Sequence, residues 1–228
     1  MDALVERLME ELNCETVFTI PVLGGIPVSE AVAVTWIIMA AVILLCMIFV
    51  RNLRVENPGR GQLLLESAVS GIYHFFDDVM GACGKDYIPY LTTVAVYIGI
   101  ANLIGILGFK PPTKDINVTG ALAVMSILLI EIAGIRKKGA KGWLKSFAEP
   151  MPVVLPINIL EIFIKPLSLC MRLFGNVLGS FVIMELLKMV VPEVLPAVFS
   201  CYFDLFDGLI QAYVFVFLTA LFIKEAAE

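Results

Sequence analysis

The sequence predicts an all-α polytopic membrane protein with five transmembrane crossings and one interfacial amphipathic helix, whose last two helices form a long, steeply tilted, antiparallel pair. The 228 residues are 60% hydrophobic and only 16% charged, with a mean hydropathy of +0.93, which is too apolar for a soluble domain. Apolar runs long enough to cross roughly 30 Å of hydrocarbon also recur along the chain, and charges gather between them. We expect a single membrane domain over residues 31–228, preceded by an external segment, residues 1–30.

This N-terminal segment is acidic and ends in a stretch rich in turn-forming residues. Its acidic start differs from the basic start of a cleaved signal peptide, so we expect it to be retained outside the membrane. The first span covers residues 31–50 and is followed by three arginines between positions 51 and 60. Residues 63–79 mix acidic, Ser and His side chains with apolar ones, which is typical of an amphipathic helix on the membrane surface.

The second and third spans cover residues 87–109 and 118–135. Two prolines in the short loop between them end the first of these helices, and Asp115 or Asn117 can cap the next one. Five basic residues follow the third span at positions 136–145, and the positive-inside rule places this loop in the cytoplasm. The arginines after the first span are two crossings away and lie on the same side. The N-terminus is therefore expected outside, and after five crossings the C-terminus is cytoplasmic.

The last two apolar segments, residues 153–191 and 195–223, are separated by a proline-containing break at residues 192–196. As continuous helices they would measure roughly 50 and 40 Å at 1.5 Å per residue, more than one perpendicular crossing requires. They must tilt strongly or run partly in the interface, and Pro166 is expected to kink the first of them. A steeply inclined antiparallel pair follows from these lengths.

A permanently charged side chain, Arg172, interrupts the apolar run at the centre of the first long segment. A central Arg in a bilayer costs a few kcal/mol, so such charges face a partner, a cavity or an ion path unless they reach the interface near a helix end. Glu161, Lys165, Arg172 and Asn176 lie within roughly 60° of one another on a helix and form one polar stripe. Glu161 and Lys165 form either a simple i, i+4 ion pair or part of an inner entrance for water.

The last segment carries three more polar groups, Asp204, Asp207 and Gln211. The two aspartates either lie solvated at the outer interface or line an aqueous path that begins outside. Asp204 and Gln211 are seven residues apart and share a helix face. Glu185, near the outer end of the preceding segment, can pair locally with Lys188. It can also line a separate cavity, because it does not share the face of the central arginine.

The composition disfavours several classes of site. The five cysteines are scattered without a CxxC pair, and His74 is the only histidine, so neither a disulfide or zinc framework nor a histidine-based catalytic pair is expected. No GxxxxGK[ST] phosphate loop occurs. We therefore predict no cofactor, no metal site and no catalysis by this chain alone. The basic residues lie in short loops that the bilayer explains, so no nucleic-acid partner is expected.

Three motifs resemble those of one known family, the a subunit of the membrane sector of F-type ATP synthases. They are KPLSLCMRLFGNVLGS at residues 165–180, PPTKDINVT at 111–119 and GLIQAYVF at 208–215. The resemblance implies a stator protein in the bacterial cytoplasmic membrane, beside a rotating ring of c subunits and with b-type peripheral stalk subunits as further partners. It also implies two offset aqueous half-channels that carry an ion, a proton or sodium, and couple its gradient to ATP synthesis.

By position, Arg172 matches the arginine that in this family faces the ring, favours ion release from an arriving ring carboxyl and blocks a leak between the half-channels. Three further residues match positions along the ion path: Asn176, Gln211 and Asp204. The chain departs from the family pattern at Phe181, where many members carry Glu or His. Glu185, one turn later on nearly the same face, is the expected substitute.

Two other classes of function stay open on the residues alone. A self-contained ion channel or secondary transporter should show inverted repeats and paired broken helices, and no such repeat is found in the sequence. A scaffold that only anchors a complex would tolerate Arg172→Ala apart from an effect on stability. The resemblance favours the ion-translocating stator subunit over both.

Overall fold

Five helices among the residues described by the computed structural model are long and apolar enough to cross a membrane, which confirms the predicted number of spans. The structure describes residues 16–20, 26–50, 59–81, 84–107, 110–147, 152–190 and 198–227. The acidic stretch before residue 16 and the predicted break at residues 192–196 lie outside these ranges. Large apolar side chains cover much of the outer surface of the helices, as expected for a surface that faces lipid.

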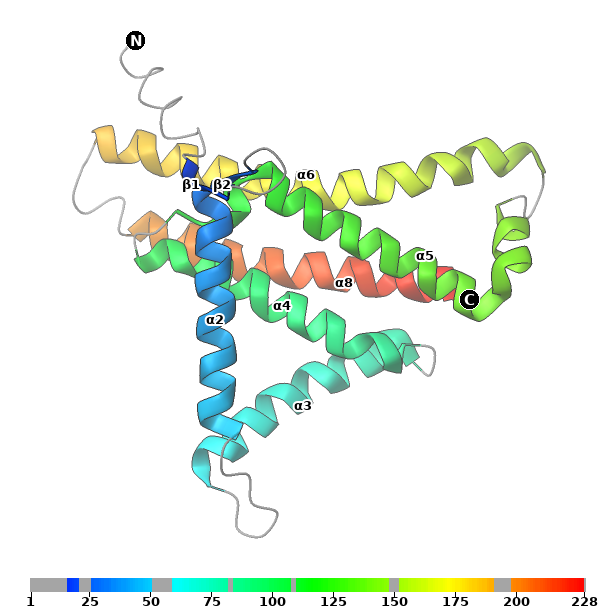
Figure 1. Cartoon of the computed structure of the whole chain (residues 1–228), viewed down its shortest axis with the longest axis horizontal. Helices are drawn as coiled ribbons and strands as arrows, with labels where there is room; N and C mark the ends of the chain where they lie inside the picture. Colours follow the sequence, from blue (N-terminus) through cyan, green and yellow to red (C-terminus); the bar gives the residue numbers. More distant parts are fainter. Residues whose placement is uncertain are drawn as a thin grey trace.

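The helix bounds agree with the predicted spans to within a few residues, except at α5, when the 3-10 and π-helical segments that adjoin α4 and α8 are counted with them (Figure 1). The long helices are α2 (Glu30–Val50), α3 (Arg60–Met80), α4 (Ile88–Leu103), α5 (Ile116–Ser146), α6 (Leu155–Val190) and α8 (Gly208–Ala227). The short helical turns are η2 (Lys85–Tyr87), η3 (Ile104–Leu107), η4 (Pro112–Lys114) and η5 (Pro152–Val154), and a π-helical segment, η6 (Cys201–Asp207), leads directly into α8.

The N-terminal segment adds a small hairpin to the otherwise helical fold. β1 (Thr16–Ile20) and β2 (Ile26–Ser29) pair antiparallel, with Thr16 opposite Ser29. These strands were not predicted from the sequence, although their Thr, Val, Phe and Ile residues favour extended backbone. The hairpin is tied to the membrane helices, because Ser29 Oγ donates a hydrogen bond to Asp115 Oδ2 over 3.3 Å.

α3 is the amphipathic helix predicted over residues 63–79. Phe76 is buried against the other helices, with only 1% of its surface exposed. The helix ends at Gly81, whose φ of +63° lies in the left-handed region that favours glycine. Lys224 Nζ from α8 donates to the carbonyl of Val79 over 3.2 Å and holds this end of α3 on the bundle. Its location at the membrane surface stays a prediction.

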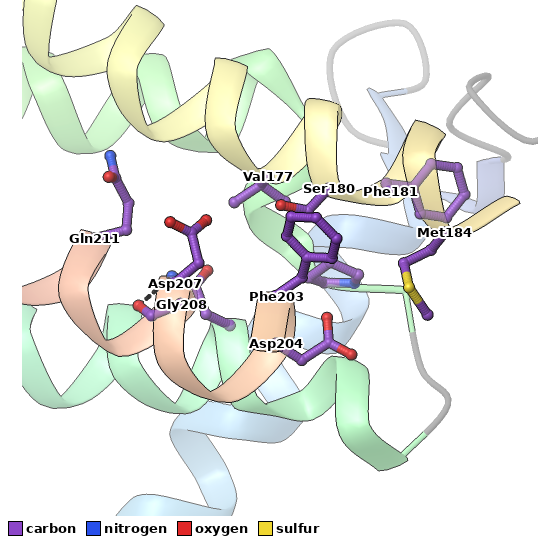
Figure 2. Close-up of a pocket in the computed structure, with 11 residues that line it drawn as sticks. Val177, Ser180, Phe181, Met184, Phe203, Asp204, Asp207, Gly208 and Gln211 are labelled. Atoms are coloured by element: carbon purple, nitrogen blue, oxygen red, sulfur yellow. Dashed lines mark hydrogen bonds between the residues drawn. The ribbon is translucent and has the colours of Figure 1, made fainter. Parts of the chain in front are cut away.

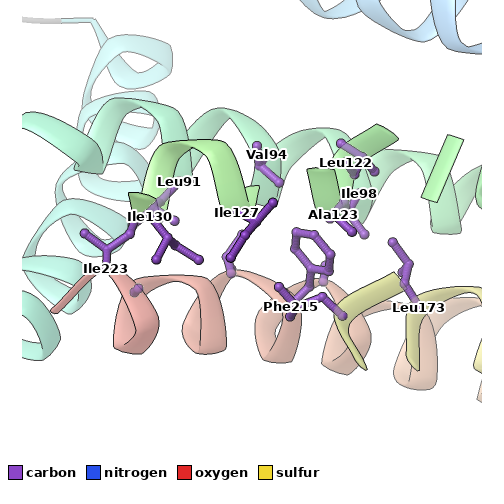
Figure 3. Packing of buried hydrophobic residues seen from close by; sticks show 14 of the residues in the cluster. Leu91, Val94, Ile98, Leu122, Ala123, Ile127, Ile130, Leu173, Phe215 and Ile223 are labelled. Atoms are coloured by element: carbon purple, nitrogen blue, oxygen red, sulfur yellow. The ribbon is translucent and has the colours of Figure 1, made fainter. Parts of the chain in front are cut away.

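The buried core lies where α4, α5, α6 and α8 meet (Figure 3). Ile98 of α4 and Leu173 of α6 are fully buried, and Phe215 of α8 and Ile130 of α5 are nearly so. Lipid tails are as apolar as these side chains, so close packing, and not removal from water, holds such helices together. The core therefore fixes the relative positions of the four helices that carry the polar residues.

α5 extends beyond the predicted span, residues 118–135. Asp115 is its N-cap, because Asp115 Oδ1 accepts a hydrogen bond from the Asn117 backbone N–H over 2.9 Å. The prediction that residues 136–145 form a loop is wrong, since they are helical on both sides of Gly139, where a non-helical backbone with φ of +73° bends the chain sharply. Lys and Arg are good helix formers, so the basic stretch itself gives no reason for the helix to end.

After this bend, the end of α5 folds back on its own helix. Trp143 Nε1 donates to Glu131 Oε2 over 2.8 Å, and the Trp143 ring packs edge-on against Phe147 at 4.8 Å. Asn158 Nδ2 of α6 donates to the Phe147 carbonyl over 2.9 Å. These contacts connect the basic end of α5 to the beginning of α6.

α6 and α8 run antiparallel, and both lie across the direction of α2 (Figure 1). α6 has 36 residues and remains one helix through Pro166, and the segment Val198–Ala227 has 30 residues. At 1.5 Å per residue they are roughly 54 and 45 Å long. The predicted pair of long antiparallel helices is confirmed, and α5 packs against both of them.

Candidate functional site

A small cavity lined by both polar and apolar side chains lies between the C-terminal part of α6 and the π-helical segment η6 (Figure 2). Its lining residues are Asn102, Pro111, Val177, Ser180, Phe181, Met184, Phe203, Asp204, Asp207, Gly208 and Gln211. The cavity has a volume of about 40 Å³. Because a water molecule needs roughly 10–15 Å³ of such space, the cavity can hold about three waters or one partly hydrated cation.

The two aspartates in the cavity wall point to different sides of η6. Figure 2 shows the Asp207 carboxylate directed toward α6 near Val177, whereas Asp204 is directed away from α6. Asp204 Oδ2 accepts a short hydrogen bond from Ser200 Oγ. Its Oδ1 lies so close to Gly105 that a Cβ on that glycine would be 2.9 Å away. Residues three apart share a face on an α-helix, so the π-helical turn is what separates the two carboxylates.

An amide pair joins α6 to α8 next to this cavity. Asn176 Nδ2 donates to Gln211 Oε1 over 2.7 Å, and Gln211 is only 3% exposed. Gln211 Nε2 has no hydrogen-bond partner among the described residues. A buried amide donor without a protein partner favours a water or another ligand in the adjacent cavity. The amide pair lies beside the cavity, on the side nearer the centre of α6.

Arg172 lies on the exposed face of α6, one turn before Asn176. Within the described ranges it makes neither an ion pair nor a hydrogen bond with another residue. Its neighbours at one turn on either side, Ser168 and Gly175, are small and also exposed. The positive charge thus points out of the helix bundle, across a surface that a second helix could approach closely.

The opposite end of the α6–α8 pair carries a cluster of charges. Lys165 Nζ is 3.3 Å from Glu161 Oε2 and 3.2 Å from Glu225 Oε2, so it links α6 to the end of α8. The ion pair expected between Glu161 and Lys165 is confirmed. Lys165 also lies over the Phe222 ring, 5.2 Å from its centre.

The structure brings together four of the predicted site residues and leaves three outside the cavity. Asp204, Asp207 and Gln211 line the cavity, and Asn176 bonds to Gln211. Arg172 and Glu161 lie elsewhere on α6. Glu185 pairs with Lys188 over 2.6 Å, as expected from their spacing, and at this level Phe181 and Met184 line the cavity instead.

Asn102 and Thr113 were not predicted as site residues from the sequence. Asn102 is 5% exposed; its Nδ2 donates to the Gly208 carbonyl over 3.0 Å, and its Oδ1 accepts from Thr113 Oγ1 over 2.8 Å. This network fixes the junction of η6 and α8 against α4. The sequence feature that could have identified Asn102 is that it is the only strongly polar residue in its span.

Lys114 was also not identified. It is 6% exposed, and its ammonium lies over the ring of Phe181, 3.9 Å from the ring centre.

Among the residues that the structure describes, no group of three or more His, Cys, Asp and Glu side chains is arranged to hold a metal ion.

Comparison with known proteins identifies the family. A family model described as ATP synthase A chain matches residues 32–224. The chain belongs to this family. It is 38% identical over 205 residues to ATP synthase subunit a of Moorella thermoacetica, which covers 89% of this chain and 93% of that protein.

Two other members of the family are similarly related. Subunit a of Legionella pneumophila strain Philadelphia 1 is 30% identical, with 90% of each chain covered. A protein of Propionigenium modestum named ATP synthase subunit a, sodium ion specific, is 34% identical, with 88% of this chain and 74% of that protein covered. The chain is thus an ion-translocating, non-catalytic stator subunit of a rotary ATP synthase and a multi-pass membrane protein.

Proposed function

We propose that Arg172 is the stator charge that faces the carboxyl groups of a rotating c-ring, and that two offset half-channels carry the coupling ion to and from this point. The observation that carries the proposal is the exposed guanidinium. Arg172 has no partner among the described residues, and an Arg at the centre of a lipid-facing helix costs roughly 2.5–3.5 kcal/mol on insertion scales unless it meets a partner or water. A ring carboxylate supplies such a partner, and the small residues beside Arg172 allow the ring to approach.

The cavity at Asp204 and Asp207 is the candidate outer half-channel. It lies beside Pro111, next to the beginning of α5, whereas the basic residues 136–145 lie at the other end of that helix. Residues 116–138, the part of α5 before the break at Gly139, span about 35 Å and separate the cavity from the first basic residues. Because basic residues favour the cytoplasmic side, the cavity opens outside and the C-terminus is cytoplasmic.

The N-terminal segment belongs on the same outer side. Ser29 bonds to Asp115, and Glu30 Oε2 is 4.0 Å from Lys110 Nζ, so the hairpin is attached to the loop beside the cavity. This attachment supports an external segment of residues 1–30 before a single membrane domain.

The inner half-channel is proposed at the opposite end, where Glu161 and Glu225 surround Lys165. Carboxylates at that end can draw water toward the cytoplasmic side of Arg172. The b-type peripheral stalk subunits are proposed as further partners, on the family resemblance, and the bacterial cytoplasmic membrane as the location.

The test is ion-driven ATP synthesis by the assembled complex in proteoliposomes. We expect Arg172→Ala to lower coupled synthesis by at least about 100-fold while the complex remains assembled, because it removes a charge that acts on the transfer step itself. Lys141→Ala, which removes an exposed positive charge from the end of α5, is the control and should retain synthesis. Unchanged synthesis by Arg172→Ala would refute the proposal. Ion conduction by the isolated chain in liposomes would instead favour a self-contained channel.

A further inference from the structure

Asp204 and Asp207 both line the outer cavity, but their carboxylates have different surroundings. Asp204 accepts a hydrogen bond from Ser200 and lies against Gly105 of η3, so its carboxylate is held within the fold. The Asp207 carboxylate makes neither a hydrogen bond nor an ion pair with any other residue that the structure describes. Figure 2 shows it directed toward α6, near Val177. The oxygens of Asp207 are therefore available to water in the cavity.

A buried amide donor faces the same cavity one turn further along the chain. Gln211 is only 3% exposed, its Oε1 accepts from Asn176 Nδ2, and its Nε2 has no partner among the described residues. Residues four apart lie on one face of a helix, and Figure 2 shows the side chains of Asp207 and Gln211 both directed toward α6. A donor and an acceptor on one side of a cavity of about 40 Å³ are suited to a water that accepts from Gln211 and donates to Asp207.

We propose that Asp207, and not Asp204, transfers the coupling proton out of the cavity, through one water held by Gln211, toward the ring carboxylate. This inference rests on the proposed function of the cavity as the outer half-channel, and it assigns the proton as the coupling ion. The protonated Asp207 carboxyl gives its proton to the oxygen of the water, and the water releases one of its own protons to the ring carboxylate. Asp207 then takes up a proton from the water in the cavity.

The positions of the polar groups favour a proton over a metal cation. The two carboxylates point to different sides of η6, so they are not arranged to share one cation. The polar atom that Gln211 presents is an N–H donor, which repels a cation but binds a water. Within the described ranges, no group of three or more His, Cys, Asp and Glu side chains could hold a metal ion. A proton that moves between a carboxyl and a water needs none of these ligands.

Asp204 is a positioning residue in this arrangement. Its contact with Gly105 places η6 against η3, and its hydrogen bond from Ser200 fixes the carboxylate there. Asp204 thereby keeps η6 in the orientation that directs Asp207 toward α6. Its negative charge also raises the local concentration of protons in the cavity. Loss of Asp204 should therefore weaken proton uptake, whereas loss of Asp207 removes the transfer step.

The experiment measures ATP synthesis by the whole complex in proteoliposomes whose lumen faces the outer half-channel. The membrane potential is fixed with potassium and valinomycin, Na⁺ is absent, and the luminal pH is lowered in steps. At each pH, synthesis per assembled complex is divided by the wild-type value, which cancels the change in driving force. Among the described residues, the other charged groups at the cavity wall are Asp204 and, behind the Phe181 ring, Lys114; the Asp207 variants keep both.

We expect Asp207→Asn to reduce this ratio to about one tenth or less at every luminal pH. Loss of a positioned proton-transfer group slows transfer by roughly 100-fold or more, and other steps also limit the wild-type rate. Asp207→Glu restores a titratable carboxyl and should remain within about 5-fold of the wild type. Asp204→Asn is the matched comparison, because its amide oxygen still accepts the bond from Ser200. Its ratio should fall at high luminal pH and return toward the wild-type value as the lumen is acidified.

Val177→Leu tests the same relay with both aspartates in place, and it decides the question if Asp207→Asn does not assemble. The larger side chain occupies the space toward which Asp207 points. It should displace the water and lower the ratio at least about 5-fold. Val177→Ala leaves that space open and should retain more synthesis than Val177→Leu.

The inference would be overturned by an Asp207→Asn complex whose synthesis recovers as the lumen is acidified, or by wild-type synthesis in Val177→Leu. A requirement of the wild-type complex for luminal Na⁺ would also overturn it, because the coupling ion would not be a proton. In each case Arg172→Ala would still abolish coupled synthesis, which leaves the proposed half-channels intact. If Arg172→Ala instead retained synthesis, the half-channel assignment itself would be wrong.

Discussion

The contact between α4 and the junction of η6 and α8 leads to a quantitative prediction for Gly208→Ala. A Cβ at position 208 would lie 2.9 Å from the Cβ of Asn102, closer than two carbon atoms pack. Neither atom is at the end of a flexible side chain, so the two backbones must separate by about 1 Å to reach normal carbon contact. The shift also lengthens the hydrogen bond from Asn102 Nδ2 to the Gly208 carbonyl.

The expected loss of stability has two parts. Overpacking of this kind costs typically 1–3 kcal/mol, and a weakened hydrogen bond adds about 0.5–1.5 kcal/mol, which gives roughly 1.5–4.5 kcal/mol in all. Because Gly208 lines the cavity, ion-driven synthesis should fall together with stability. Gly99→Ala is the matched control: Gly99 is also buried in a helix, but a Cβ there would meet nothing within 4 Å.

The assay is retention of the assembled complex on heating, together with synthesis at a permissive temperature. Gly99→Ala should be neutral or more stable by up to about 1 kcal/mol, because Ala is the better helix former. If Gly208→Ala matched Gly99→Ala in both measurements, the close approach of α4 to α8 would not exist in the protein.

Two further predictions concern the predicted path residues. Gln211→Leu should lower ion-driven synthesis about 10-fold but change thermal stability by less than about 1 kcal/mol. The hydrogen bond lost to Asn176 is offset by removal of an unpaired buried amide donor. A large loss of stability with normal synthesis would show a structural role only. Glu185→Gln tests whether Glu185 serves the outer half-channel in place of the acidic residue absent at Phe181: reduced synthesis with normal assembly is expected, and full synthesis would exclude that role.

The number and positions of the spans were predictable because few backbone structures are stable in lipid. Every backbone polar group in the bilayer must be satisfied within a helix, so long apolar runs become helices whatever they pack against. The same argument predicts the lengths of α6 and α8 and hence their inclination. It does not apply to residues 136–145, because outside the lipid a charged stretch can be a loop or a helix, and local contacts such as Trp143 with Glu131 decide.

The site was only partly predictable for a different reason. Helical spacing relates residues on one helix, which is why the polar stripe containing Arg172 could be found. The partners that form the cavity come from distant parts of the chain: Asn102 and Gly208 are 106 residues apart, and Lys114 reaches Phe181 on another helix. No periodicity within one segment predicts such contacts.

On the proposed function, the order of charges along the path determines where the ion can go. A cation that enters from outside meets two carboxylates, Asp204 and Asp207, then the neutral amides of Gln211 and Asn176, and then the guanidinium of Arg172. The cation is therefore attracted at the two carboxylates and repelled at the guanidinium further along the path. The ion cannot pass the arginine within the stator, so the carboxyl of a ring helix beside the exposed face of α6 is the acceptor that remains. Rotation of the ring is then the only route by which the ion reaches the inner half-channel.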